Sequence, residues 1–285
     1  MSENIDDFTP SMNILRWDGE SVREVRDELA QEEPLEIRVN DRPVSVTMRT
    51  PGNDFELAAG FLLSEGMIRA ASDVARIAFC GKNADANVLN ITLAPGVSVD
   101  FERLTRHVFG SSSCGLCGKA TIDSVRAQFP PVESSLRIDP DLIASLPDKM
   151  REAQTTFART GGLHASAIFD ADGKFIVLRE DVGRHNALDK VLGHCLLKGI
   201  FPLDRHILVV SGRTSFEIMQ KALAGRIPVI AAVSAPSSLA ARFARESGQT
   251  LIGFLRGRRM NVYSHPNRIA FTTTPTPDDR DRPNW

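Results

Sequence analysis

The second half of the chain alternates short apolar runs with helical patterns, and this alternation constrains the fold more than any other feature. Apolar runs at 163–169, 207–210, 229–233 and 251–255 are typical of buried strands. Strands separated by helices of this length form a sheet with parallel members and helices on both faces. The residues therefore predict an α/β domain over 156–270. The helical patterns lie at 187–196, 216–223 and 239–245, and a further strand at 175–178 follows a turn at 170–173.

The first half predicts a smaller α+β unit over 34–109. Apolar side chains alternate with polar ones on both sides of Asn40-Asp41, which is typical of a β-hairpin with one buried face. Helix start and stop signals follow the hairpin, and two more strand patterns come after them. The expected elements are strands at 35–39 and 44–48, a helix capped by Asn53 or Asp54 and ended by Gly66, and strands at 74–79 and 88–93.

The chain ends and the middle of the chain carry weaker patterns. Residues 1–33 are polar and acidic with little periodicity, so we expect a flexible N-terminal arm. Residues 110–155 are interpreted as a loop, a helix and a linker, because Pro130-Pro131 stops the helical pattern. The tail at 271–285 is rich in proline, threonine and charge, and it is expected to be disordered.

Composition and charge exclude several classes of protein. Hydrophobic residues make up 42% of the 285 residues and charged ones 25%, which excludes disorder throughout the chain. A formal net charge of −2 gives no general basic footprint, so neither nucleic acid nor a membrane is expected as a partner. The longest apolar runs, such as 227–233, are too short to span a bilayer, and the N-terminus lacks the pattern of a secretory signal. We therefore expect a soluble, cytoplasmic protein.

Four cysteines are too few for a disulfide scaffold, but Cys114 and Cys117 form a Cys-x-x-Cys pair. Cys195 lies on the apolar stripe of an expected helix and is interpreted as a packed thiol. Cys80 ends an expected strand and is interpreted as a packed or capping thiol rather than a ligand. The pair lies in the sequence GSSSCGLCGK at 110–119, where glycine and serine predict a flexible polar loop. The chemistry of the chain is therefore sought first at this loop.

Three kinds of site are open for the cysteine pair. A structural zinc site needs four ligands, and His107 is the nearest further candidate, so zinc is not expected. A thioredoxin-like dithiol normally follows an early strand of a compact βαβ unit, whereas about 110 residues precede this pair. A sulfur carrier needs a thiol that reaches both a donor and an acceptor, and a flexible loop offers that reach. Chemistry alone does not say whether Cys114 or Cys117 would be loaded.

Nearby positive charge favours the reactive thiolate form of these cysteines. Lys119 and the start of the expected helix after the loop would both stabilise a negative charge on a neighbouring sulfur. A persulfide on one cysteine can then be attacked by the other thiol, which releases sulfur and leaves a disulfide to be reset.

Two segments that follow strands have residues suited to an anion. The sequence FLRGRR at 254–259 is expected at the end of the last strand, where α/β sheets commonly place ligands. Guanidinium groups bind phosphate and glycine lets a backbone approach, although a solvated basic edge has the same composition. The turn at 211–215 opens a helix and could cradle an anion, but it matches no nucleotide fingerprint. His164 is interpreted as structural, and for His185 a structural or a catalytic role stays open. The candidate binding residues are Phe254, Leu255, Arg256, Gly257, Arg258 and Arg259.

Five blocks of the sequence together resemble one family, the FdhD family of formate dehydrogenase accessory sulfurtransferases. The resemblance covers about 35 to 268, with the blocks in the expected order. The blocks read PLEIRVNDRPVSVTMRTPGNDFELAAGFLLSEGMI, SSSCGLCGK, TGGLHASAIFDADGKFIVLREDVGRHNALDKVLG, VVSGRTSFEIMQKAL and GFLRGRRMNVYSHP.

The resemblance implies a sulfurtransferase that acts as a persulfide sulfur carrier. Such a protein takes sulfur from a cysteine desulfurase and passes it to the molybdenum of a bis(molybdopterin guanine dinucleotide) cofactor, which then enters formate dehydrogenase. By the matching motifs, Cys114 bears the persulfide, Cys117 is its companion, and 254–259 binds the cofactor, whose guanine nucleotide moiety fits the anion interpretation. The family also implies a homodimer. Two alternatives stay open: a non-catalytic cofactor chaperone with a redox-sensing pair, and a thiol–disulfide oxidoreductase.

The resemblance further implies that the larger domain is a three-layer, cytidine-deaminase-like fold. The residues argue against the deaminase reaction. His185-Asn186-Ala187 stands where a deaminase carries His-Ala-Glu, so the glutamate that moves protons is missing. The turn at 213–217 also lacks the Pro-Cys-x-x-Cys of the zinc site. We therefore expect the scaffold without its zinc chemistry.

Overall fold

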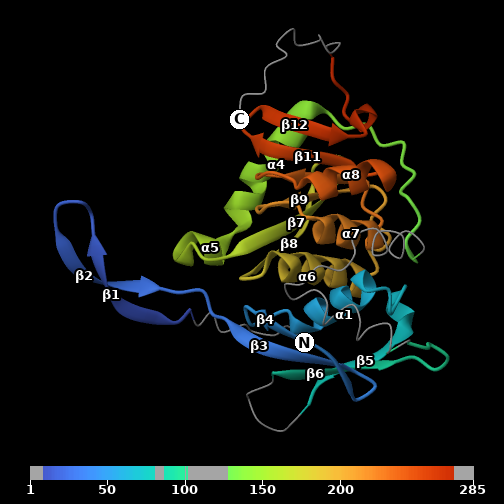
Figure 1. The fold of residues 1–285 in the computed structure, drawn as a ribbon, viewed down its shortest axis with the longest axis horizontal. Helices are drawn as coiled ribbons and strands as arrows, with labels where there is room; N and C mark the ends of the chain where they lie inside the picture. Colours follow the sequence, from blue (N-terminus) through green and yellow to red (C-terminus); the bar gives the residue numbers. More distant parts are fainter. Residues whose placement is uncertain (1–8, 81–86, 100, 102–127, 273–285) are drawn as a thin grey trace.

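The fold is that of a computed structural model, which describes residues 9–80, 87–99, 101 and 128–272 (Figure 1). Within these residues the strands form a two-stranded hairpin, a four-stranded sheet and a six-stranded sheet. No helix of the described residues is long and apolar enough to cross a membrane. The expected loop with Cys114 and Cys117 lies outside the described residues, as do most of the expected helix after it and of the expected tail.

The elements follow the chain in two groups. The N-terminal group is β1 (Ser11–Trp17), β2 (Val22–Glu28), β3 (Glu33–Val39), β4 (Arg42–Arg49), α1 (Asp54–Ser64), the 3-10 helix η1 (Ala71–Asp73), β5 (Val74–Phe79) and β6 (Val88–Leu93). The C-terminal group is α4 (Pro140–Ala153), α5 (Thr155–Thr160), β7 (His164–Asp170), β8 (Phe175–Asp181), α6 (Arg184–Leu197), β9 (His206–Val210), α7 (Phe216–Ala224), β10 (Val229–Ala232), α8 (Ser238–Glu246), β11 (Thr250–Arg256), β12 (Arg259–Ser264) and the 3-10 helix η2 (Pro266–Arg268).

The six-stranded sheet is the centre of the C-terminal group, with the order β12-β11-β10-β9-β7-β8. β9, β10 and β11 are parallel, whereas β7, β8 and β12 pair antiparallel with their neighbours. One apolar cluster joins the sheet to α6, α7 and α8, and a second joins its other face to α4 (Figure 1). The predicted α/β sheet with parallel members and helices on both faces is therefore confirmed. Its likeness to a cytidine deaminase stays a prediction.

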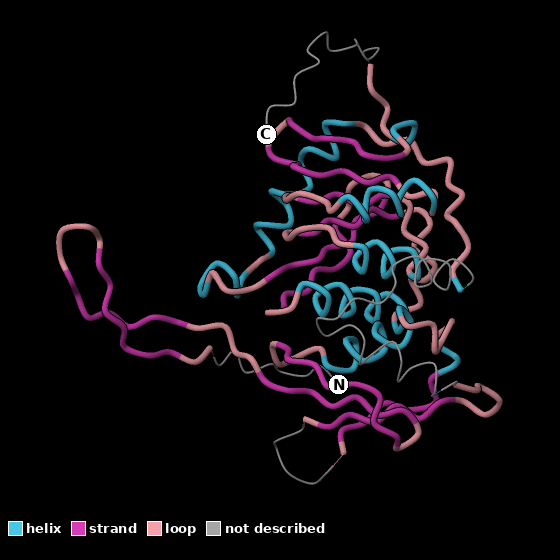
Figure 2. The backbone as a smooth tube through the Cα atoms, in the orientation of Figure 1, coloured by secondary structure: helices cyan, strands magenta, loops and turns pink. Residues whose placement is uncertain are grey.

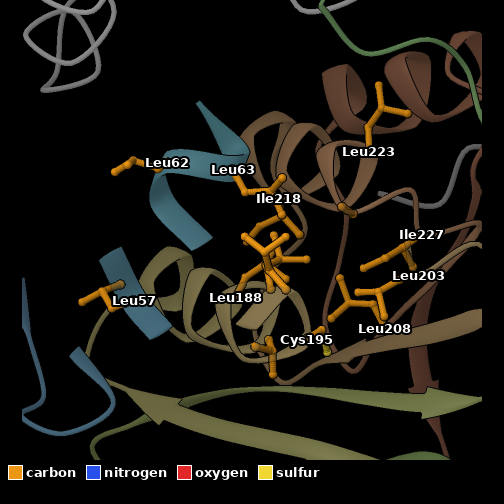
Figure 3. Packing of buried hydrophobic residues seen from close by; sticks show 14 of the residues in the cluster. Leu57, Leu62, Leu63, Leu188, Cys195, Leu203, Leu208, Ile218, Leu223 and Ile227 are labelled. Carbon is orange, nitrogen blue, oxygen red and sulfur yellow. The ribbon is translucent and has the colours of Figure 1, made fainter. Parts of the chain in front are cut away.

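The N-terminal sheet has the order β4-β3-β6-β5 and carries α1, which packs against α6 of the C-terminal group. Figure 3 shows part of the shared apolar cluster, in which Leu63 of α1 lies toward Ile218 of α7 and Leu188 of α6, whereas Leu57 points to the other side. Asn40 and Asp41 form the expected turn between β3 and β4, with φ values of 47° and 65°. The predicted α+β unit is thus joined to the α/β sheet through a pair of helices.

Two glycines allow α1 and α6 to lie unusually close together. A Cβ atom added to Gly60 would lie 1.8 Å from the carbonyl oxygen of Asp189, and one added to Gly193 would lie 1.8 Å from the carbonyl oxygen of Glu56. Each helix backbone therefore occupies the place where a side chain of the other would stand. No other residue type fits at these two positions without moving the helices apart.

The segment expected to be a flexible arm contains a β-hairpin. β1 and β2 pair over their full length, and they project away from both larger sheets (Figure 2). Their apolar and charged side chains are mixed on both faces of the hairpin, so the sequence shows neither strict alternation nor a buried stripe. The expectation was therefore wrong for 11–28.

The segment expected to be a linker contains a helix, α4. Asp139 is the N-cap of α4, and its Oδ1 accepts hydrogen bonds from the backbone N–H groups of Asp141 and Leu142 at 2.7 and 3.3 Å. Pro140 occupies the first turn, where a missing N–H costs nothing. The Asp-Pro start signal was present in the sequence, but neighbouring prolines concealed it.

Three local predictions also require correction. Cys80 is exposed rather than packed, whereas Cys195 is fully buried as expected. Asn53 stands at the N-cap of α1 but makes no side-chain cap bond; Asp54 instead binds the guanidinium group of Arg49. The basic segment does not end the last strand, because β12 follows β11 and pairs back onto it.

Candidate functional site

A pocket of about 640 Å³ lies at the edge of the six-stranded sheet where the parallel strands end. Ser211 follows β9, Val233 follows β10, and Leu255 and Arg256 end β11, and all four line the pocket. Ligands of α/β sheets bind at the carboxyl ends of parallel strands, because the loops diverge there and leave a crevice. The volume is that of a site for one nucleotide-sized group.

The opposite wall of the pocket comes from α4, α5 and the start of β7. Arg151 and Phe157 line it together, and the guanidinium carbon lies 4.3 Å from the ring centroid in a cation–π contact. Gln154 is only 4% exposed, and within the described part of the chain its side-chain amide makes no hydrogen bond. The amide atoms are not fully enclosed, so they face the open space of the pocket and are available to hydrogen-bond a ligand there. Gln154 is therefore a candidate binding residue.

Sequence reasoning missed this wall because it interpreted the region as a linker. The available signal was the Asp139-Pro140 start of α4, followed by the apolar residues Ile143, Leu146 and Met150 on the buried face of that helix. Nothing in the sequence alone indicates that the helix ends beside the basic segment.

The structure separates the three predicted arginines. Arg256 lines the pocket with Leu255 and Gly257, and its Nε donates to the carbonyl of Val233 at 3.4 Å. Arg258 instead pairs with Asp141 of α4 at 2.7 Å, with both side chains exposed. Arg259 begins β12 and stands opposite Arg256 in the strand register. One arginine of the three is thus positioned for a ligand in this pocket.

The backbone at the β11–β12 corner is unusual at two of the predicted residues. Phe254 has a φ of 53° and Gly257 a φ of 51°, both in the left-handed region. A non-glycine residue there costs about 1 kcal/mol or more, and such strain persists where the surrounding structure holds it. The backbone N–H of Phe254 donates to the carbonyl of Ser234 at 3.1 Å, and the phenyl ring stays exposed. The corner therefore presents an aromatic ring beside a backbone that a ligand can approach.

The second predicted anion segment contributes less to the pocket. Within 211–215 the pocket is lined by Ser211, while Ser215 stands at the N-cap of α7 with its Oγ 3.4 Å from Nε2 of His185. Burial, with the charges of Lys221 and Arg184, lowers the pKa of His185 to about 4. This histidine is therefore neutral near pH 7.

His164 takes a place that the sequence did not indicate. It begins β7 and lines the pocket, and burial together with the charge of Arg184 lowers its pKa. The predicted persulfide residue Cys114 and its companion Cys117 lie outside the described residues, so the distance from either thiol to the pocket stays untested.

Comparisons with known proteins agree in one family. The model of the FdhD/NarQ family matches residues 30–270. A sulfur carrier protein FdhD of Streptomyces avermitilis is 52% identical over 274 residues, covering 92% of this chain and 96% of its own. One of Mycobacterium tuberculosis is 51% identical over 252 residues, covering 85% and 91%. The crystal structure of a formate dehydrogenase accessory protein from Desulfotalea psychrophila superimposes with a TM-score of 0.74 at 26% identity, covering 92% of this chain and 99% of its own. A match of this extent shows that the chain belongs to the FdhD/NarQ family.

Proposed function

We propose that this protein is a sulfur carrier that serves formate dehydrogenase. The observation that carries the proposal is the family match over 30–270, which includes both cysteines of the Cys-x-x-Cys pair. Relatives about half identical to this chain are named sulfur carrier proteins, and a solved structure of similar fold is described as a formate dehydrogenase accessory protein. The pocket beside Arg256 adds a site for the molecule that receives the sulfur.

In the loading step, the Cys114 thiolate attacks the outer sulfur of a persulfide held by a cysteine desulfurase. The S–S bond of the donor breaks, a new S–S bond forms on Cys114, and the donor leaves as a thiolate. The reaction exchanges one persulfide for another, so it requires neither an oxidant nor a reductant.

In the delivery step, the Cys117 thiolate attacks the inner sulfur of the loaded Cys114. A Cys114–Cys117 disulfide forms, and the outer sulfur leaves with the bonding electron pair as hydrosulfide. Two thiol sulfurs lose two electrons and the transferred sulfur gains them, so the step balances. A dithiol reductant then resets the pair. The acceptor is the molybdenum of the bis(molybdopterin guanine dinucleotide) cofactor.

The pocket would hold one guanine nucleotide moiety of that cofactor. The Arg256 guanidinium group can bind the pyrophosphate in two parallel hydrogen bonds, and Gly257 lets the backbone approach it. The Gln154 amide offers a donor and an acceptor to the edge of the base, and the Phe157 ring offers a stacking face. These residues suit a phosphate and a planar heterocycle within one site.

The Cys114→Ser variant should accept no sulfur and should fail to activate formate dehydrogenase, because a hydroxyl cannot form a persulfide. The measurement is intact-protein mass after incubation with a cysteine desulfurase and cysteine, where wild type gains one sulfur that a dithiol removes. Cys117→Ser should still load but should release sulfur slowly. Cys80→Ser is the matched control, since that thiol is exposed and lies outside the Cys-x-x-Cys pair, and it should behave as wild type. Full activation by Cys114→Ser would instead favour a non-catalytic chaperone.

Binding of GDP should distinguish the arginines of the basic segment. Arg256→Ala should weaken binding about tenfold or more, because a charge-assisted hydrogen bond to phosphate contributes about 1.5–3 kcal/mol. Arg258→Ala is the matched control with little effect, since that guanidinium group already pairs with Asp141. Gln154→Leu should reduce the preference for GDP over ADP and leave the phosphate contribution in place. Isothermal titration calorimetry measures the GDP affinity of wild type and of the three variants. An equal loss of GDP affinity in Arg256→Ala and Arg258→Ala would contradict this site.

A further inference from the structure

A second group of polar side chains lies at the same edge of the six-stranded sheet, next to the pocket. β7 lies between β9 and β8 in this sheet, so its first residue, His164, stands between the ends of those two strands (Figure 1). His164 pairs in register with Asp181, the last residue of β8, and Arg184 begins α6 shortly after it. His164 and Ser211 also line the pocket, so the group is continuous with it.

The side chains of His164 and Arg184 come together over Gly212. A Cβ atom added to Gly212 would lie 3.2 Å from Nδ1 of His164 and 3.8 Å from Cδ of Arg184. The glycine therefore leaves open a small space between its backbone and both side chains. Because Nε is bonded directly to this Cδ, the guanidinium group of Arg184 lies beside the part of the pocket wall that His164 and Ser211 form.

The charge of Arg184 has no partner within the described residues. Its Nε is buried and makes no hydrogen bond there, and no ion pair between described residues includes this arginine. A guanidinium group stays charged at any physiological pH, so a half-buried one without a counter-charge costs free energy. An anion bound beside Arg184 would offset that cost.

The carboxylates of this region do not supply the missing charge. Asp181 pairs with Lys190 at 2.7 Å and accepts from the amide nitrogen of Asn186 at 3.0 Å. Glu217 of α7 stays exposed, and in the part of the chain that the structure describes it forms no ion pair with Arg184. The positive charge of Arg184 is therefore left available to a ligand.

The histidines beside Arg184 favour an oxyanion over a metal cation. Burial and neighbouring positive charges lower the pKa of His164 and of His185, so both rings are neutral near pH 7. A neutral imidazole can donate one hydrogen bond or bind a metal ion through its free nitrogen. The guanidinium group next to these rings would repel a metal cation and attract an anion. Arg184 thus supplies charge, and His164 can add a hydrogen bond.

We propose that Arg184, His164 and the backbone at Gly212 form a phosphate subsite next to the nucleotide pocket. Its occupant is a phosphate-type oxyanion, which is either a phosphoryl group of the ligand in the pocket or free inorganic phosphate. The guanidinium group can bind two of its oxygens in parallel hydrogen bonds. The first source rests on the proposed nucleotide pocket, whereas the second does not. The subsite uses none of the residues 254–259.

Titration with inorganic phosphate at constant ionic strength tests the subsite directly. Isothermal titration calorimetry of the full-length protein should show saturable binding, and Arg184→Gln should weaken it about tenfold or more. Arg213→Gln is the matched control, because Arg213 is exposed and directly follows Gly212, and it should bind phosphate like wild type. An equal loss in both variants would show attraction to surface charge alone and would overturn the proposal.

Guanine nucleotides distinguish the two sources of the oxyanion. If the pocket ligand supplies it, wild type should bind GTP about tenfold more tightly than GDP, Arg184→Gln should lose this preference, and phosphate should compete with GTP. If free phosphate is the occupant, it should bind equally well to the GDP-loaded protein, and Arg184→Gln should leave nucleotide affinities unchanged. A protein in which neither phosphate nor GTP binding depends on Arg184 has no such subsite. The nucleotide pocket would still stand if GDP binding required Arg256.

The stability of Arg184→Gln separates ligand binding from a structural role. In phosphate-free buffer this variant should be at least as stable as wild type, since it removes a charge that no described residue balances. Phosphate should raise the Tm of wild type and leave that of Arg184→Gln unchanged. A variant clearly less stable than wild type without phosphate would assign the guanidinium group to the fold and contradict the proposal.

Discussion

Replacing Gly193 of α6 by alanine is expected to destabilise the protein by about 3 kcal/mol or more, although alanine is the better helix former. The new methyl group would lie 1.8 Å from the carbonyl oxygen of Glu56 in α1. A backbone carbonyl inside a helix cannot rotate away, so the two helices must separate. That separation opens the apolar cluster that joins the N-terminal sheet to the rest of the fold.

Urea unfolding followed by circular dichroism measures this effect as a change in the free energy of unfolding. Gly60→Ala should cost a similar amount, because the added Cβ would lie equally close to the carbonyl oxygen of Asp189. Leu197→Ala is the control, since it changes an exposed position of the same helix and should cost less than about 1 kcal/mol. A Gly193→Ala variant as stable as wild type would show that α1 and α6 do not cross this closely.

The strands of the C-terminal sheet could be predicted because their sequences record burial on both faces. Residues such as Ile207, Leu208 and Val209 are all fully buried, which gives a continuous apolar run. The stripe on α6 from Ala187 to Leu196 was equally clear, because these apolar residues are buried where α6 packs between the sheet and α1. The apolar pattern was therefore enough to predict a strand or helix wherever that element is buried in a core.

The same reasoning failed where no core imposes a pattern. The hairpin of β1 and β2 keeps Trp17 and Val22 exposed, so its sequence resembles that of an arm. α4 buries one face, but Pro147 lies inside it and other prolines precede it, and these residues normally end helices. In both cases the backbone conformation is set by local pairing or capping that a hydrophobic pattern does not record.

The anion site at the basic segment stays a prediction, and the structure adds how the residues of that segment are arranged. The composition of the basic segment indicated an anion site, but the corner between β11 and β12 decides that Arg256 faces the pocket while Arg258 turns to Asp141. A sequence does not distinguish the roles of arginines that lie so close together. Only the direction of the strand and of the turn after it decides which side chain faces the pocket. Gln154 became visible only once α4 placed it against this corner.

The interior also holds charged groups that the sequence did not distinguish from surface ones. Lys221 of α7 and Asp189 of α6 are 7% and 2% exposed, and their closest N–O distance is 2.7 Å. Ser64 of α1 donates to Asp189 and accepts from Lys221, at 3.0 and 2.9 Å. The cluster thus ties three helices together. Its cost of desolvation is offset only while all three groups are present.

Lys221→Met should therefore destabilise the protein by about 3–5 kcal/mol, because it leaves a buried carboxylate without its counter-charge. The double variant Lys221→Met/Asp189→Leu should recover most of this loss, since it removes both charges and keeps the volume apolar. Chemical unfolding of the two single variants and the double variant measures the coupling. Equal losses in Lys221→Met and the double variant would show that the lysine stabilises the fold by packing alone.

The pH dependence of Lys221→Met provides a second measurement of the same charge. Burial raises the pKa of Asp189 above its usual value, and without the lysine charge that pKa rises further. A carboxyl group whose folded pKa exceeds its unfolded pKa binds its proton more tightly in the folded state, so the fold loses stability as pH rises through that window. The variant should consequently lie closer to wild type at pH 5 than at pH 7.5. This difference should vanish in Lys221→Met/Asp189→Leu, because no carboxylate is left to titrate.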